Sequence, residues 1–221
     1  MPARRPHLLL LNASLAGETG NTAVLLARAR RLLARHATVE SITLAPRPDA
    51  ALSPLSSLNA RLRVGLGLSP QLHAALTRAD GFLIGTGTHW DSWSSVLQKF
   101  LEDATATEAT KLWLGKPAAV LVSEHSTGGK GVLSRLQGVL VTLGCSIPPM
   151  SGLVLSRAAV LAAQHAPDPA ATRDFWCEDD LRVVCHNLAE AARITLPAAR
   201  PGHPRWCAWP VDRRDFAARW I

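Results

Sequence analysis

Residues 8–22 read Leu8-Leu-Leu-Leu-Asn-Ala-Ser-Leu-Ala-Gly-Glu-Thr-Gly-Asn-Thr22. In this stretch an apolar run gives way to small, hydroxyl-bearing and glycine residues, and a helical pattern begins directly after them. This order is typical of a buried strand, a loop and the N-terminus of a helix. The loop hydroxyls and the free amides of the first helical turn suit a phosphate monoester. The nucleotide-binding patterns Gly-x-x-x-x-Gly-Lys-Ser/Thr and Gly-x-Gly-x-x-Gly are both missing, which argues against a nucleoside triphosphate in this loop.

Apolar runs and helical periodicities alternate along the remainder of the chain. Besides the first strand, we expect strands at 39–44, 80–86, 117–122 and 147–155, and helices at 22–35, 71–78, 93–104, 133–143 and 171–194. Residues 45–70 show no sustained period and read as a long connection with a short helix near Leu58. The alternation predicts an α/β sandwich of three layers, in which helices cover both faces of a five-stranded parallel sheet. Ligands of such sheets bind beyond the carboxyl ends of the strands, and three loops of small residues are expected at that edge.

The composition is that of one globular chain with an excess of positive charge. Its 221 residues are 48% hydrophobic and 19% charged, and the formal net charge is +7. Residues 196–221 hold five arginines and two aspartates, and therefore supply +3 of that charge. Because no zinc-finger spacing, RNA-binding motif or lysine-rich block accompanies the charge, we expect no specific nucleic-acid partner.

Neither the cysteines nor the apolar stretches predict a metal site or a membrane segment. The four cysteines form no Cys-x-x-Cys pair and read as reduced thiols. The four leucines at 8–11 are too few for a secretory signal, and polar residues and prolines interrupt the uncharged stretch 136–156. The sequence therefore predicts a cytoplasmic protein with no membrane span.

Three segments resemble the flavodoxin-like superfamily, and within it the NADPH-dependent FMN reductases and the related quinone reductases. Residues 12–22 are similar to the phosphate loop of that family, Gly-Ser-x-x-x-x-Gly-Asn-Thr. Residues 79–103 resemble its block that runs from Ala-Asp-Gly through Thr-Pro-x-Tyr to Leu-Lys-x-Phe-Leu-Asp. Residues 115–131 resemble its fourth strand and the glycine-rich loop that follows. The resemblance spans residues 8–145 and implies a flavodoxin-like fold.

The resemblance implies FMN as the bound cofactor and NADPH or NADH as the hydride donor. The implied activity is that of an oxidoreductase that passes hydride through FMN to a quinone, a flavin or a similar small acceptor. We name no catalytic residue, because the first half-reaction needs no protein acid or base; His89 and His125 are candidates to donate a proton to a reduced quinone. The phosphate is expected at Ser14, Thr19, Gly20, Asn21 and Thr22. The flavin ring is expected beside two further groups, Thr86, Gly87, Thr88, His89, Trp90 and Asp91 after the third strand and Ser123, His125, Ser126, Thr127, Gly128 and Gly129 after the fourth.

The chain departs from the family pattern at several of these positions. Gly87 replaces the usual proline, and Ala16 and Glu18 stand where many reductases carry Arg or Lys, so the choice between NADPH and NADH stays open. Trp90 takes the place of the usual tyrosine, and the chain has no tyrosine at all. Two other hypotheses stay open: a flavodoxin-type electron carrier, and a flavodoxin-like interaction module that has lost FMN. The basic charge argues against the carrier, because such carriers are usually acidic around the flavin.

We expect two parts of unequal size, an FMN-binding domain at 1–195 and a C-terminal extension at 196–221. The extension holds three of the seven tryptophans. Three such side chains are not expected to stay wholly exposed, so the extension should cap the flavin cleft, pack against a partner subunit or cover the protein's own core. The family resemblance implies a homodimer or homotetramer.

Overall fold

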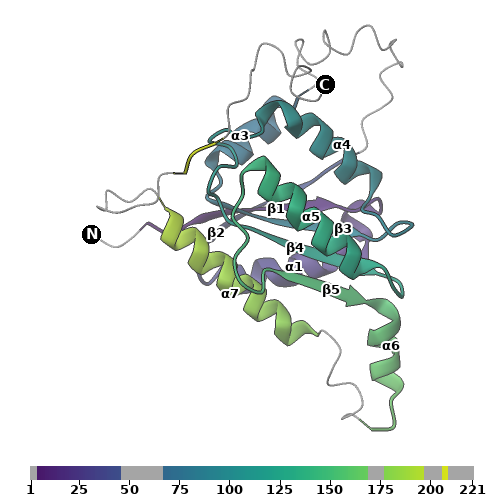
Figure 1. Ribbon diagram of the computed structural model, residues 1–221. Coiled ribbons are helices and arrows are strands. Elements are labelled where there is room, and N and C mark those ends of the chain that lie inside the picture. The colour runs from purple at the N-terminus through teal and green to yellow at the C-terminus, as the bar shows by residue number, and fades with distance from the viewer. Residues whose placement is uncertain (1–3, 46–66, 169–176, 197–205, 209–221) are drawn as a thin grey trace, which may run out of the picture.

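The computed structural model describes residues 4–45, 67–168, 177–196 and 206–208. At its centre lies a parallel sheet of five strands in the order β2-β1-β3-β4-β5 (Figure 1). The strands are β1 (His7–Ala13), β2 (Thr38–Thr43), β3 (Gly81–Gly87), β4 (Ala118–Glu124) and β5 (Gly152–Ser156). The expected flavodoxin-like sheet is confirmed.

Helices cover both faces of this sheet, as the alternation of patterns predicts (Figure 1). On one face lie α1 (Asn21–Leu33) and α7 (Glu178–Thr195), and on the other lie α3 (Pro70–Arg78), α4 (Ser95–Ala104) and α5 (Gly129–Leu143). Short 3-10 turns, η1 (Gly17–Thr19) and η3 (Thr105–Thr107), complete the described helices together with α6 (Arg157–His165). The first strand shows why the central strands are apolar throughout: Leu8 packs into the core under α1 and α7, and Leu9 packs into the core under the other helices.

Several elements differ from the expected ones. The fifth strand begins at Gly152 rather than near residue 147, because two prolines precede it and Met150 has a φ of 52°, which ends the extended conformation. Helix α6 is not among the expected helices. None of its residues is buried, and a helix without a buried face needs no apolar stripe that would reveal it in the sequence. Helix α7 begins at Glu178 rather than near 171. Cys177 is its N-cap residue, and the N–H of Cys177 donates to Asp180 Oδ2 at 2.7 Å. Residues 169–176 and the helix expected near Leu58 lie outside the described residues.

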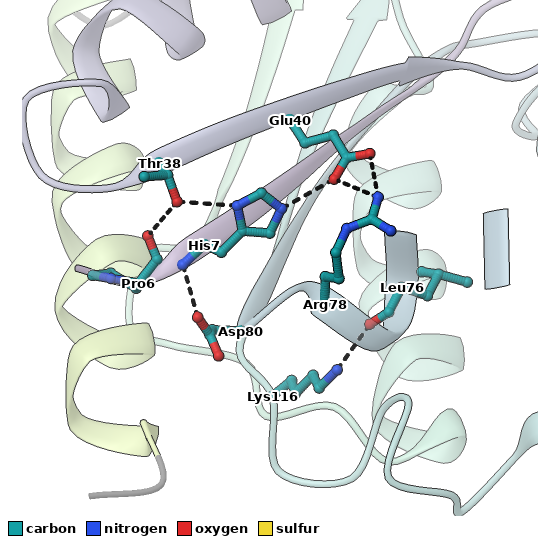
Figure 2. Close-up of polar contacts among 8 residues, drawn as sticks. All are labelled: Pro6, His7, Thr38, Glu40, Leu76, Arg78, Asp80 and Lys116. Carbon is teal, nitrogen blue, oxygen red and sulfur yellow. Dashed lines mark hydrogen bonds and ion pairs between the residues drawn. The ribbon is translucent and has the colours of Figure 1, made fainter. Parts of the chain in front are cut away.

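A polar cluster closes the amino edge of the sheet, away from the loops that follow the strands (Figure 2). His7 lies between Thr38 Oγ1 and Glu40 Oε2, each 3.0 Å from a ring nitrogen, and Arg78 donates to both Glu40 oxygens at 2.9 and 3.1 Å. The Thr38 hydroxyl itself donates to Pro6 O at 3.3 Å, which extends the cluster to the residue before β1. This cluster ties β1, β2 and α3 together.

Strand register brings the three expected loops to one place. At the carboxyl edge Ala13 of β1 pairs with Thr86 of β3, Gly87 pairs with Ser123 of β4, and Glu124 pairs with Ser156 of β5. The loops that leave β1, β3 and β4 therefore start side by side. Within the described ranges, no helix combines the length and the apolarity needed to cross a membrane.

Candidate functional site

The loop after β1 is shaped by its own side chains. Asn12 is buried; its Nδ2 donates to Gly17 O at 2.8 Å and its Oδ1 accepts from Ser14 N–H at 3.2 Å. Ser14 Oγ accepts from Ala16 N–H at 3.2 Å, and Thr19 Oγ1 donates to Ala16 O at 3.0 Å. These bonds fold residues 12–19 into a compact loop, so the helix that follows starts in a fixed position.

Helix α1 begins without a side-chain cap. Its N-cap residue is Gly20, which has no side chain to accept a hydrogen bond from an amide of the first turn. In α3, α4 and α6 a serine hydroxyl accepts such a bond, from Ser69, Ser94 and Ser156 respectively. The amides of the first α1 turn therefore keep free hydrogen-bonding capacity and the positive end of the helix dipole. A capless N-terminus behind a hydroxyl-rich loop is suited to an anion.

Close packing holds α1 against the middle of the sheet. A Cβ on Gly85 of β3 would lie 2.8 Å from Leu26 Cδ1 and 2.9 Å from Thr22 Cγ2, so only glycine admits the helix this near. Thr22 is almost completely buried, and its Oγ1 lies 2.7 Å from Ser123 Oγ at the end of β4. This hydroxyl pair links the first loop to the third.

The loop after β3 forms a tight hairpin. His89 and Ser92 exchange backbone hydrogen bonds of 2.8 and 2.9 Å, and the two residues between them have positive φ, 48° at Trp90 and 56° at Asp91. Arg135 of α5 anchors the turn, because its guanidinium donates to Asp91 O and lies 5.8 Å from the centre of the Trp93 ring. Trp90 is fully exposed at the tip.

The loop after β4 is held by a carboxylate. Glu124 Oε2 accepts from Gly129 N–H at 2.5 Å, which occupies the first amide of α5. Gly128 precedes it with a φ of 95°, and a Cβ there would strike Asp91 Oδ1, so glycine lets the second and third loops touch.

The three loops surround one pocket of about 420 Å³. Of the residues expected from the sequence, ten line it: Ser14, Thr19, Gly20, Asn21, Thr22, Gly87, Thr88, His89, Ser123 and His125. The other seven do not: Thr86, Trp90, Asp91, Ser126, Thr127, Gly128 and Gly129.

The buried position of Thr86 explains its separation from the pocket. Its hydroxyl donates to Gly87 O at 3.2 Å and accepts from Ser94 N–H at 3.3 Å, so it connects β3 to the start of α4. Thr88 Oγ1, in contrast, is buried and has no hydrogen-bond partner among the described residues. This hydroxyl in the pocket wall is therefore available to a bound group.

Sequence reasoning missed four residues that line the pocket, Leu15, Ala16, Glu124 and Arg157, and one that shapes the first loop, Asn12. Asn12 shapes the first loop, Glu124 lines the pocket beside Ser123, and Arg157 contributes a guanidinium from the start of α6. Asn12 has a local signal, because an amide just before a turn commonly bonds the backbone ahead of it. Arg157 has none, because it lies more than 130 residues from the phosphate loop and reaches the pocket only through the β4–β5 pairing. The pocket thus combines amide and hydroxyl donors, one cation and one carboxylate.

Several solved structures share this fold. RosB with a bound 8-demethyl-8-formylriboflavin-5'-phosphate is 18% identical, covers 86% of this chain with 79% of its own, and has a TM-score of 0.64. An oxidoreductase from Corynebacterium diphtheriae is 16% identical, the match covers 85% of this chain and 97% of that one, and the TM-score is 0.59. The apo form of EMOB, an NADH:FMN oxidoreductase, is 18% identical, the match covers 90% of this chain and 93% of that one, and the TM-score is 0.54. At these identities the likeness establishes the fold.

The sequence itself establishes the family. A comparison with curated proteins finds no matching sequence. The sequence model of the NADPH-dependent FMN reductase family matches residues 6–159. This range is more than half of the chain and includes all three loops of the pocket. The chain therefore belongs to the NADPH-dependent FMN reductase family and is an FMN-dependent NAD(P)H oxidoreductase.

Proposed function

We propose that the pocket at the carboxyl edge is the FMN site, and that the enzyme reduces a quinone, a free flavin or a similar small acceptor there. One observation carries the proposal: the uncapped N-terminus of α1 opens into the pocket that residues of all three loops line. Phosphate monoesters bind such helix ends, and the neighbouring loops supply room for a polar ring.

The donor set fits the phosphate of FMN. Ser14, Thr19 and Thr22 contribute hydroxyls, and Gly20 and Asn21 contribute backbone amides. A Cβ on Gly20 would lie 2.7 Å from Ala16 Cβ and 3.2 Å from Ser14 Oγ, so this residue leaves the loop open. Arg157 supplies the fixed positive charge that the loop itself lacks.

The second and third loops fit the flavin ring. The unpartnered Thr88 hydroxyl is suited to a polar ring atom, and Ser123, whose carbonyl accepts from Thr88 N–H at 2.9 Å, and His125 line the same pocket. We propose that Trp90 and Asp91 of the hairpin, together with Ser126, Thr127, Gly128 and Gly129, flank the ring without lining the pocket floor. Trp90 would then stack on an aromatic ring at the pocket mouth.

When bound, FMN supplies hydride acceptance and hydride transfer. The chain holds the phosphate, orients the ring and delivers a proton to the reduced acceptor. His89 lines the pocket, and its Nε2 lies near Gly87, 3.3 Å from where a Cβ on that residue would be. We propose that His89 or His125 donates this proton, and that Gly87 replaces the family proline because the His89 ring uses the space.

The test is the spectrum of the purified protein, followed by identification of the ligand that denaturation releases. We expect flavin absorbance, release of FMN, and oxidation of NADPH or NADH when a quinone is added. A colourless protein that neither gains stability with FMN nor oxidises either donor would overturn the proposal and favour the interaction module. One-electron exchange with a reductase, without NAD(P)H oxidation, would favour the electron carrier.

We also propose that the enzyme is a cytoplasmic homodimer or homotetramer, with 1–195 as its FMN-binding domain and 196–221 as an extension. Most of the extension lies outside the described residues. Its described part contains Trp206, whose ring lies where a Cβ on Gly115 would stand, so this tryptophan covers the protein's own surface. Sedimentation analysis and cell fractionation test the assembly and the location.

A further inference from the structure

A second cavity, of about 350 Å³, lies between α1 and α7, which pack on the same face of the sheet (Figure 1). The residues that line it come from the end of α1 and from the middle of α7: Leu32, Arg35, His36, Arg182, Cys185 and His186. The proposed FMN pocket lies at the start of α1, so the length of this helix separates the two places by roughly 20 Å. The second cavity is therefore not part of the flavin site.

The lining of the second cavity is basic. It contains two arginines and two histidines, all exposed, and none of its described lining residues is acidic. Its buried part includes the Cys185 thiol, whose Sγ lies 3.9 Å from Ala29 O. Burial raises the pKa of this thiol to about 12, so it adds no negative charge. The two arginines give the lining a charge of +2, and protonation of both histidines adds +2 to make +4.

Neighbouring acidic groups leave most of this charge uncompensated. No hydrogen bond or ion pair engages the Arg35 guanidinium within the described part of the chain. Arg182 lies 3.6 Å from Asp179, but the two side chains are 72% and 80% exposed, and such a pair is weak. The charge of Glu190 acts on both histidines, yet this carboxylate already accepts from Arg193 at 3.0 and 2.7 Å.

The end of α1 does not supply the missing negative charge. Carbonyl groups at the C-terminus of a helix attract cations, but here they have other donors. Leu33 O accepts from the N–H groups of His36 and Ala37 at 2.8 and 2.9 Å. Ala34 O accepts from Arg5 at 2.8 Å. The basic side chains of the cavity are therefore free to bind an anion from solution.

The two histidines lie close enough to contact one ligand group together. The ring centroids of His36 and His186 are 6.3 Å apart, and the ring planes are nearly perpendicular, at 89°. Hydrogen bonds to oxygen span about 2.9 Å, so a group with several oxygens placed between the rings can reach both. Guanidinium groups match phosphate in the same way, because two of their N–H groups can bond two oxygens at once.

We propose that the second cavity binds a small multivalent oxyanion, a phosphate or polyphosphate group, between α1 and α7. An extended polyanion fits less well, because basic side chains of both segments converge on one depression of small-molecule size. Neither FMN binding nor hydride transfer needs this site, so the proposal does not rest on the proposed function. Because the imidazole group gains its charge as pH falls, the cavity should bind an anion more tightly at lower pH.

Arg35→Gln is the decisive variant, and Arg31→Gln is its matched control. Arg31 is exposed on α1 and does not line the cavity, so the control removes the same charge from nearly the same place. Pyrophosphate is added at constant ionic strength and pH 7, and the backbone amide signals of His36 and His186 are followed by NMR. We expect Arg35→Gln to raise the Kd about tenfold, because a charge-assisted hydrogen bond is lost, and Arg31→Gln to change it less than about twofold.

Sulfate tests the contribution of the histidines, because it stays doubly charged over the range in which imidazole titrates. We expect its Kd in the wild-type protein to rise about fivefold between about pH 5.5 and about pH 8. His186→Gln should reduce this dependence, since only His36 of the cavity then titrates. His73→Gln is the control, because His73 lies on α3 and does not line the cavity.

Three results would overturn the inference. The first is an equal Kd for pyrophosphate in Arg35→Gln and Arg31→Gln. The second is a pyrophosphate response confined to the amides of Gly20 and Asn21, which would place the anion in the flavin pocket alone. The third is tighter binding of a single-stranded oligonucleotide with shifts that extend over the exposed side of α1, which would indicate a nucleic-acid surface. Because the signals at the two ends of α1 are separate, failure of the FMN proposal would leave this test intact.

Discussion

Gly20 is a residue at which the absence of a side chain matters for binding. Its φ of −82° is open to any residue, so the constraint is space: a Cβ would press on Ala16 and on the Ser14 hydroxyl. The loop would have to open, which would misplace its donors relative to a phosphate. A glycine here is therefore required by the close packing of the loop rather than by the backbone conformation.

We expect Gly20→Ala to raise the Kd for FMN by about tenfold or more, because one lost hydrogen bond to a charged group costs about 1.5 kcal/mol. Titration of the apoprotein with FMN measures the change. Gly138→Ala is the control: a Cβ there meets nothing within 4 Å, so the helix should gain about 0.5–1 kcal/mol with no change in Kd. Equal Kd values for the two variants would contradict the assignment of the loop.

Glu40 connects a single residue to the pH dependence of stability. Burial alone would raise its pKa, but hydrogen bonds from His7 and Arg78 and the charge of Arg78 outweigh burial and hold the pKa below its ordinary value of 4.5. A carboxyl with a depressed pKa in the folded state stabilises the protein above its unfolded pKa, and this contribution is lost as pH falls through the folded value.

We therefore expect Glu40→Gln to flatten the loss of stability between about pH 5 and about pH 3. Urea unfolding at a series of pH values measures the slope for both proteins. Glu102→Gln is a suitable control, because Glu102 accepts only from Gln98 Nε2 and forms no ion pair within the described part of the chain. A wild-type slope in Glu40→Gln would show that the cluster in Figure 2 does not couple to pH.

Among the elements, the hairpin after β3 holds a residue in a backbone conformation that its side chain disfavours. Turns with two positive φ values favour Asn, Asp and Gly, so Asp91 fits this turn but Trp90 does not. The surrounding structure imposes the turn through the His89–Ser92 pair, the Arg135 anchor and the close approach of Gly128. Strain at an exposed aromatic beside a pocket is typical of a residue kept for ligand binding.

Trp90→Gly should separate stability from binding. Glycine removes a left-handed strain of about 1–2 kcal/mol and adds an entropic cost of about 0.5–1 kcal/mol, so the apoprotein should gain about 0.5–1 kcal/mol. The affinity for FMN or for an aromatic acceptor should fall, because the stacking surface is gone. Chemical denaturation and flavin fluorescence report the two effects; a destabilised variant that binds normally would contradict both expectations.

At the scale of the whole molecule, the proposed FMN pocket and Trp206 lie at opposite edges of the sheet. Trp206 packs on Gly115, just before β4, whereas Ser123 ends that strand at the pocket. Eight residues of extended chain separate them by roughly 25 Å. The yellow segment of Figure 1 lies near α3, away from the carboxyl edge.

Trp206→Ala should therefore leave FMN binding intact. We expect FMN at about 100 times its Kd to raise the free energy of unfolding by about 2.7 kcal/mol in wild type and variant alike. Thermal unfolding with and without FMN measures both increments. A smaller increment in the variant would mean that this part of the extension reaches the flavin site.

The sequence by itself determined the layers, the five strands, the loops at one edge and the family. Each depends on a short-range signal: apolar runs for strands, the stripe from Val96 to Ala104 for α4, and the motif of residues 12–22 for the first loop. Within the site, ten of the expected residues line the pocket because parallel strands end their loops at a common edge.

Only the tertiary structure decided the rest. Helix α6 has no buried stripe to predict it, and Thr86 shows how a residue inside a loop motif can serve packing alone. The cation beside the phosphate loop comes from Arg157, and the second cavity joins residues of α1 and α7. These contacts connect parts of the chain that are far apart in sequence. Burial and strand pairing fix them, and no local pattern of side chains records which distant segments will meet.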